Sequence, residues 1–124
     1  MVTPHTHVVS AHEDGAIEQA VEQLIAGNLV ALPTETVYGL AADALNATAV
    51  AKIYAAKGRP SNNPLICHVA NAAMADRYVS TGEVAKKLMD AFWPGPLTLV
   101  LPQKPGNAVP ALVSANLPTL AVRC

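Results

Sequence analysis

One stretch of the 124-residue chain, from Leu29 to Leu40, most constrains how the protein can fold. Its first part, Leu29–Leu32, is a short apolar run that predicts a buried strand. Pro33 cannot donate a hydrogen bond to a neighbouring strand, so we expect the strand pairing to end there. The next residues, Thr34–Gly39, include hydroxyls, a carboxylate, an aromatic ring and a glycine, which are poor choices for a core. We therefore predict a loop at the C-terminal end of a strand.

A loop in this position has two interpretations. In open α/β sheets, ligands bind beside the C-terminal ends of strands, because the sheet holds the polar loops rigidly around a crevice. The alternative is a polar turn that binds nothing. The segment taken alone does not separate a binding loop from such a turn.

The remaining pattern alternates helices and strands. Apolar residues from Ile17 to Ile25 recur at helical spacing, which predicts a helix with one buried face that ends at Gly27. Asn46 can cap a second helix over residues 47–57, which Gly58 would end. We expect further helices at 72–78 and 82–92, the latter with a Ser80–Glu83 capping box and a buried stripe of Val84, Ala85, Leu88, Met89 and Phe92, and strands at 65–69, 97–101 and 117–123.

Composition narrows the class of protein. With 52% hydrophobic and 14% charged residues, the chain is too apolar to be disordered, and its length suits one domain. We predict an N-terminal polar segment at residues 1–12 and a domain at 13–124. No apolar run reaches the roughly 18 to 20 residues that span a bilayer, and no signal peptide pattern opens the chain, so we expect a cytoplasmic protein with no membrane contact.

The charge and the cysteine and histidine content bear on two further classes of function, nucleic-acid binding and metal binding. The net charge of −1 gives no overall basic field, so nucleic-acid binding would need a local patch. Cys67 and Cys124 lack metal-ligand spacing, and Cys67 lies within an apolar run, where we expect it to act as a small hydrophobe. The N-terminal histidines have no carboxylate cluster nearby, so we interpret them as solvated residues rather than metal ligands: His5, His7 and His12.

Three charged positions are candidate binding residues. Lys57 and Arg59 flank the expected helix end, where they could either oppose the helix dipole or bind a polyphosphate. The prolines that follow would hold Arg59 and the nearby amides in place, which suits a phosphate ligand. Arg123 ends an apolar strand, either as part of a site or as an edge arginine in solvent.

His68 interrupts the strand expected at 65–69. Strand alternation places Leu65, Cys67 and Val69 on one face and His68 on the other, so it could face a crevice or be a hydrogen-bonded structural residue. The turn Trp93–Pro96 is most simply structural, with the indole buried. We find no Walker-type loop, dinucleotide fingerprint, paired metal ligands or nucleophile triad.

Five blocks of the sequence together carry a family resemblance. In their order and spacing they resemble the YrdC-like family of threonylcarbamoyl-AMP synthases. The resemblance runs from about Gly15 to Cys124 and implies an α/β fold with a twisted, mixed, open sheet flanked by helices. The blocks are Leu32–Leu40, Lys57–Pro60, Asn63–Val69, Trp93–Thr98 and Ala121–Arg123.

The resemblance implies a nucleotidyltransferase that makes L-threonylcarbamoyl-AMP and pyrophosphate from L-threonine, bicarbonate and ATP. Partner proteins would then use the product to form N6-threonylcarbamoyladenosine in tRNA, and Mg²⁺ would accompany ATP. By matching position, L-threonine would contact Thr36, His68 and Arg123, and ATP would contact Lys57, Arg59, Asn63 and Thr119. No residue is assigned a covalent or acid–base role, and no metal ligand is assigned.

The resemblance also implies a domain that continues past Cys124, through a Ser-x-Asn motif that completes the nucleotide site. We therefore expect the C-terminal part of the domain to be missing. Ser114-Ala115-Asn116 has the same letters but precedes the Ala121–Arg123 block, so we interpret it as a coincidence. Two alternatives stay open: an RNA-binding module of the same fold, for which aromatic residues are few, and a related carbamoyl-transfer domain with another acceptor.

Overall fold

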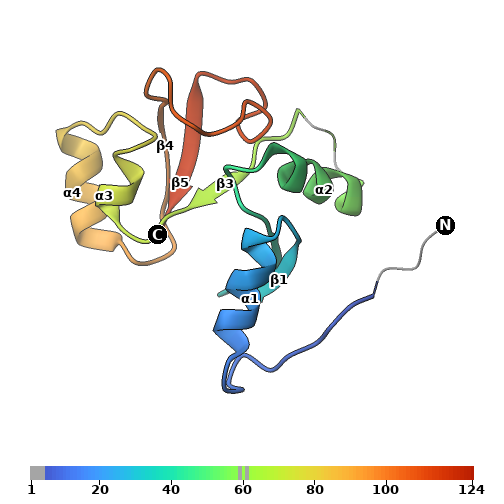
Figure 1. The fold of residues 1–124 in the computed structure, drawn as a ribbon. Helices are drawn as coiled ribbons and strands as arrows, with labels where there is room; N and C mark the ends of the chain where they lie inside the picture. Colours follow the sequence, from blue (N-terminus) through green and yellow to red (C-terminus); the bar gives the residue numbers. More distant parts are fainter. Residues whose placement is uncertain (1–4, 59, 61) are drawn as a thin grey trace.

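The computed structural model describes residues 5–58, 60 and 62–124, which form four helices and five strands (Figure 1). The strands fall into a two-stranded and a three-stranded sheet. The mixed α/β class predicted from the sequence is confirmed. In chain order the elements are α1 (Ala16–Ile25), β1 (Val30–Pro33), β2 (Tyr38–Ala41), α2 (Ala47–Lys57), β3 (Ile66–His68), α3 (Ala72–Ala75), α4 (Glu83–Phe92), β4 (Thr98–Pro102) and β5 (Thr119–Arg123).

β5 is the central strand of the larger sheet, whose order is β3-β5-β4. It runs parallel to β3 and antiparallel to β4, so the sheet is mixed. Leu120 and Val122 point into the core, where they are almost fully buried. Their burial supplies the hydrophobic free energy that holds the strand between its neighbours, roughly 1.5 to 3 kcal/mol for each such side chain.

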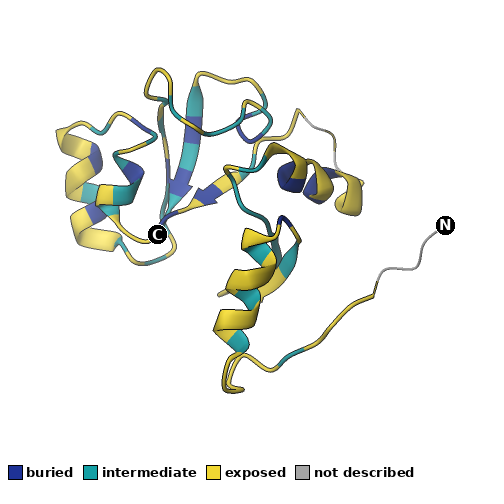
Figure 2. Cartoon of the chain, in the orientation of Figure 1, coloured by how far each residue is buried: buried dark blue, intermediate teal, exposed yellow. Residues whose placement is uncertain are grey.

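The core lies on one face of this sheet. Tyr54 of α2, Ala75 of α3 and Met89 of α4 pack there against Cys67, Leu99 and Val122 of the strands. Figure 2 shows this burial as dark blue segments that line the inner sides of the helices and the central strand. The other face, which we call the open face, is not covered by these helices and carries Ile66, His68, Thr98, Val100, Thr119, Ala121 and Arg123.

Several sequence predictions are confirmed in detail. Asn46 caps α2 by accepting a hydrogen bond from the Ala49 amide at 3.1 Å, and Gly58 ends the helix with a left-handed backbone at φ 60°. Such a φ favours glycine because it has no Cβ. The Trp93 ring is half-buried against the core, and its Nε1–H donates to the Leu97 carbonyl at 2.8 Å, which fixes the turn.

The N-terminal region departs from the prediction in three ways. Tyr38–Ala41 is a strand that pairs with β1, so the loop predicted at 34–39 is shorter and joins two strands of a hairpin. β1 ends at Pro33, as expected, but the strand predicted to be buried is mostly exposed, and Leu32 is 38% exposed. The helix α1 forms, but its apolar stripe is not buried: Ile17 and Ile25 are exposed, because neither the hairpin nor the larger sheet covers that side.

The fourth helix also corrects the sequence analysis. α4 begins after Gly82, and no side-chain hydrogen bond caps this helix end. The Ser80–Glu83 capping box therefore does not form. Ala85 and Met89 are buried as predicted, whereas Val84 and Phe92 are exposed. The buried stripe is narrower than the pattern suggested, because α4 packs at the edge of the core rather than across it.

Candidate functional site

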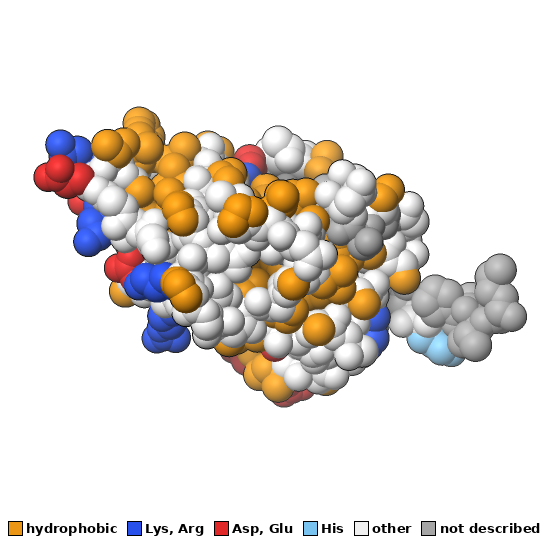
Figure 3. Space-filling view, turned by 90° about the horizontal axis from the view of Figure 1, so that it is seen from above, with side chains coloured by type: hydrophobic (Ala, Val, Ile, Leu, Met, Phe, Trp, Pro, Cys, Tyr) orange, Lys and Arg blue, Asp and Glu red, His pale blue; other side chains and the backbone are white. Residues whose placement is uncertain are grey.

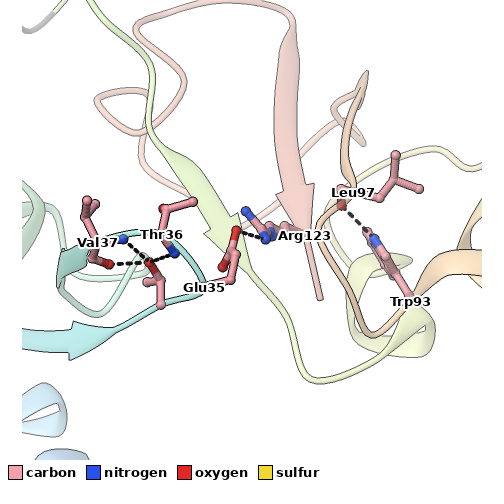
Figure 4. Close-up of polar contacts among 7 residues, drawn as sticks. Glu35, Thr36, Val37, Trp93, Leu97 and Arg123 are labelled. Carbon is pink, nitrogen blue, oxygen red and sulfur yellow. Dashed lines mark hydrogen bonds and ion pairs between the residues drawn. The ribbon is translucent and has the colours of Figure 1, made fainter.

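The turn between β1 and β2 is built by Thr34. Its Oγ1 accepts hydrogen bonds from the amides of Thr36 at 3.4 Å and Val37 at 3.2 Å, and its hydroxyl donates to the Val37 carbonyl (Figure 4). Backbone amides and carbonyls in a hairpin turn have no partners on a neighbouring strand, and a threonine hydroxyl in the turn can supply hydrogen bonds to them. The side chains of Glu35 and Thr36 are therefore left exposed at the tip.

A row of three polar residues crosses the open face at the end of the larger sheet. His68 of β3 and Thr98 of β4 are both the register partners of Arg123 on β5. Register partners share a face of a sheet and lie about 4.5 to 5.5 Å apart. Because Val122 is anchored in the core, strand alternation turns Arg123 to the open face.

The turn and the row meet through an ion pair. Arg123 Nη2 contacts Glu35 Oε1, although the two residues are 88 positions apart in the sequence. The Arg123 guanidinium is the main cause that lowers the pKa of the Glu35 carboxyl below its ordinary value, and the charge of His68 acts in the same direction. Glu35 is thus ionised at neutral pH and is paired with Arg123 of the row.

These contacts bring the predicted L-threonine residues together. Thr36 is adjacent to Glu35 in the turn, while His68 and Arg123 are register partners. Arginine offers a planar fork of donors that suits a carboxylate. The arrangement can therefore hold a small anion at the end of the sheet, next to hydroxyl and imidazole groups.

The predicted ATP residues are more widely spread. Thr119 lies on the open face at the other end of β5, four residues and roughly 13 Å from Arg123. Lys57 is exposed at the end of α2. Asn63 lies in the loop that follows, where its carbonyl accepts a hydrogen bond from the Tyr54 hydroxyl at 2.8 Å. Arg59 lies outside the described residues.

Two residues of this region were given no role by the sequence analysis. Glu35 is the one carboxylate in the polar turn, and Thr98 alternates with the buried Leu99. Alternation along 97–101 could have placed Thr98 on the open face. No local signal could have joined Glu35 to Arg123, because that contact depends on how the hairpin docks against β5.

Other features of the chain do not join the row. A cavity of about 430 Å³ is lined by residues of the 103–118 loop, and one of about 300 Å³ lies beside Trp93 and Cys124. Neither includes a predicted site residue. Ser114 is buried in a turn and donates to the Ala111 carbonyl at 3.3 Å, which is a structural use. Over the described ranges there is no group of three or more His, Cys, Asp or Glu that could hold a metal ion.

Within the described residues, no helix combines the length and the apolar character needed to cross a bilayer. Figure 3 shows one surface of the molecule, where basic and acidic side chains are interspersed at the end that carries α3 and α4. A mixed surface of this kind does not provide the continuous positive field that binds phosphate backbones.

Comparison with known proteins decides the family. A family model for Sua5, YciO and YrdC proteins, described as Telomere recombination, matches residues 22–124. This chain belongs to the Sua5/YciO/YrdC family. The resemblance drawn from the five sequence blocks is thereby confirmed.

Relatives in this family are substantially longer. The threonylcarbamoyl-AMP synthase of Bacillus subtilis is 52% identical over 111 residues, which cover 89% of this chain and 32% of the relative. The synthase of Pyrococcus abyssi is 47% identical over 112 residues, with 90% and 32% covered. A crystal structure of P. abyssi Sua5 complexed with L-threonine matches with a TM-score of 0.84 at 47% identity, over 90% of this chain and 32% of that one. The chain thus spans about a third of the length of these relatives, and its YrdC-like fold is confirmed.

Proposed function

We propose that this protein takes part in the synthesis of L-threonylcarbamoyl-AMP, with L-threonine, bicarbonate and ATP as substrates and pyrophosphate as the second product. The observation that carries the proposal is the row at the end of the larger sheet, where Arg123 is the register partner of His68 and is ion-paired with Glu35, the neighbour of Thr36. Two relatives at 47 and 52% identity are named threonylcarbamoyl-AMP synthases, and the P. abyssi protein is known in complex with L-threonine.

In this proposal Arg123 receives the carboxylate of L-threonine, and His68 and Thr36 contact the rest of the amino acid. Charge-assisted bonds from a guanidinium to a carboxylate are strong and directional, so they would fix the orientation of the amine. After loss of the ammonium proton, the neutral amine would attack the carbon of bicarbonate to form a carbamate, with release of water. A fixed orientation raises the rate by removing the entropy cost of aligning the reactants.

The second half of the reaction is attack of a carbamate oxygen on the α-phosphorus of ATP. Lys57 and Arg59 would offset the charge that develops on the phosphates, with Asn63 and Thr119 as further contacts. Magnesium would enter with the ATP phosphates as part of that substrate. No covalent intermediate with the protein is required, so the residues act by position and charge. In the cell, the product would pass to cytoplasmic partner proteins that modify tRNA.

A calorimetric titration tests this function. L-Threonine is titrated into the wild-type chain, into Arg123→Ala, and into Arg77→Ala as a matched control, because Arg77 is an exposed arginine next to α3. We expect Arg123→Ala to weaken threonine binding at least about tenfold, since a bond to a charged group is lost. Arg77→Ala should bind like the wild type.

A parallel titration with ATP uses Arg59→Ala, which we expect to weaken nucleotide binding while threonine binding is retained. A folded chain that binds neither ligand would contradict the proposal. Pyrophosphate release that does not depend on L-threonine would instead favour the related carbamoyl-transfer reaction. RNA binding that falls steeply with salt and ignores threonine would favour the RNA-binding module.

A further inference from the structure

The ion pair between Glu35 and Arg123 has a consequence for the choice of substrate, which rests on the proposed function. Glu35 lies on the hairpin turn and contacts the same guanidinium that would receive the substrate carboxylate. The Glu35 side chain is 49% exposed and that of Arg123 is 22% exposed, so a small solute can reach both. Figure 4 shows the two side chains directed toward each other at the end of β5.

The contact leaves donors on Arg123 for a second partner. Among the described residues, the side-chain bond recorded for Arg123 is the one from Nη2 to Glu35 Oε1. A guanidinium has five N–H donors arranged in a plane, so one edge can bind Glu35 while another binds a second carboxylate. Occupation of one nitrogen therefore does not by itself block a substrate.

The charges of the pair are also complementary to the two charged groups of an amino acid. A free amino acid presents a carboxylate and an ammonium group on neighbouring atoms, and here a fixed cation and a fixed anion lie in contact. If the carboxylate of the ligand lies on Arg123, its ammonium group comes close to Glu35. The opposite charges of the ammonium group and the Glu35 carboxylate would attract each other at short distance, even in a partly solvated site.

We propose that Glu35 is a specificity-determining residue that binds the α-ammonium group of L-threonine while Arg123 binds the carboxylate. Glu35 selects amino acids over hydroxy acids of the same shape, because only the amino acid offers a cation to its carboxylate. The neighbouring Thr36 and the register partner His68 remain available to the rest of the ligand.

The contrary mechanism makes a different prediction. Glu35 could compete with the ligand carboxylate for Arg123, as an internal substitute for the substrate. Removal of its charge would then strengthen binding of every carboxylate ligand, with or without an amino group. A ligand pair that differs only in the amino group separates the two mechanisms.

The experiment titrates L-threonine and 3-hydroxybutyrate, its counterpart without the amino group, into the wild type and Glu35→Gln. Glutamine keeps the size and polarity of the side chain but removes its charge. We expect Glu35→Gln to weaken L-threonine binding about tenfold and to leave 3-hydroxybutyrate binding unchanged or stronger. Glu83→Gln is the matched control, because Glu83 is an exposed glutamate at the start of α4, and it should behave like the wild type with both ligands. Glu35→Asp, which retains the charge on a shorter side chain, should bind threonine with intermediate affinity.

Thermal unfolding of each variant shows that the comparison is made on folded protein. Tighter binding of both ligands to Glu35→Gln would overturn the inference in favour of competition. An unchanged affinity for L-threonine would overturn it as well, while the proposed function would stand on the Arg123→Ala result. A wild-type chain that binds no L-threonine would overturn both.

Discussion

The residues around Arg123 determine where its side chain lies and how freely it can move. It follows the fully buried Val122, and its backbone pairs with two strands, so the side chain is held at a fixed point. A mobile arginine at a strand end would lose rotamer entropy when it binds a ligand. The ion pair with Glu35 has already restricted the Arg123 side chain, so part of that cost is met on folding.

The two cysteines also differ in their surroundings. Cys67 lies on β3 inside the core, and burial raises the pKa of its thiol from 9.0 to about 11. Cys124 follows β5, is partly exposed, and donates through Sγ to the Ala70 carbonyl at 3.4 Å. Only thiolates react quickly with alkylating reagents, so the two side chains should differ in reactivity.

We predict that iodoacetamide at pH 8 modifies Cys124 and leaves Cys67 unmodified in the folded chain. The raised pKa keeps Cys67 protonated, and its thiolate fraction grows only as the pH approaches 11. Mass spectrometry counts the modified thiols, with Cys124→Ser as a control that should take up no label until urea unfolds it. Rapid labelling of Cys67 at pH 8 would show that the core opens readily.

At the scale of elements, α1 and α2 show that an amphipathic pattern predicts a helix better than it predicts burial. α1 has a clear apolar stripe, yet none of its ten residues is buried. α2 is rich in alanine and has a weaker stripe, yet Ala49, Val50, Ile53 and Tyr54 on one of its faces are buried. The stripe of α1 shows that the helix can pack on one side, but only a neighbouring element can bury it.

A matched pair of substitutions tests this difference. Ile25 in α1 is 75% exposed and Ile53 in α2 is 6% exposed. Both substitutions replace isoleucine by alanine, so the difference in intrinsic helix propensity between the two residue types is the same for both. We expect Ile53→Ala to lower the free energy of unfolding by about 2 to 5 kcal/mol and Ile25→Ala to change it by about 0.5 kcal/mol or less. Urea denaturation measures both. Equal losses would mean that the α1 stripe is covered in solution.

At the scale of the whole molecule, the chain has a core region around β5 and a lightly attached N-terminal region. The larger sheet and α2 to α4 share one hydrophobic core. Among the described residues, the polar contacts that tie the region of α1, β1 and β2 to this core include the ion pair of Glu35 with Arg123 and a bond from Lys52 Nζ to the Gly27 carbonyl at 2.9 Å. Figure 1 shows this region below the larger sheet.

Hydrogen exchange should reflect this arrangement. We expect the amides of β5 to exchange most slowly, because that strand is paired on both sides and its inward side chains are buried. Amides of α1 should exchange at least about tenfold faster, and those of α2 should resemble β5. Protection of α1 equal to that of β5 would contradict the division into two regions.

The local features of this protein follow from short stretches of its amino-acid sequence. The Asn46 cap, the Gly58 stop and the alternation that buries Cys67 but not His68 depend on neighbouring residues along the chain, so they could be predicted. The five sequence blocks also indicated the family. The pairing of Tyr38–Ala41 with β1, the exposure of α1 and the contact of Glu35 with Arg123 were decided only in the tertiary structure. Each of these depends on which distant surfaces meet, and the free energy of such contacts is set by packing that no local pattern contains.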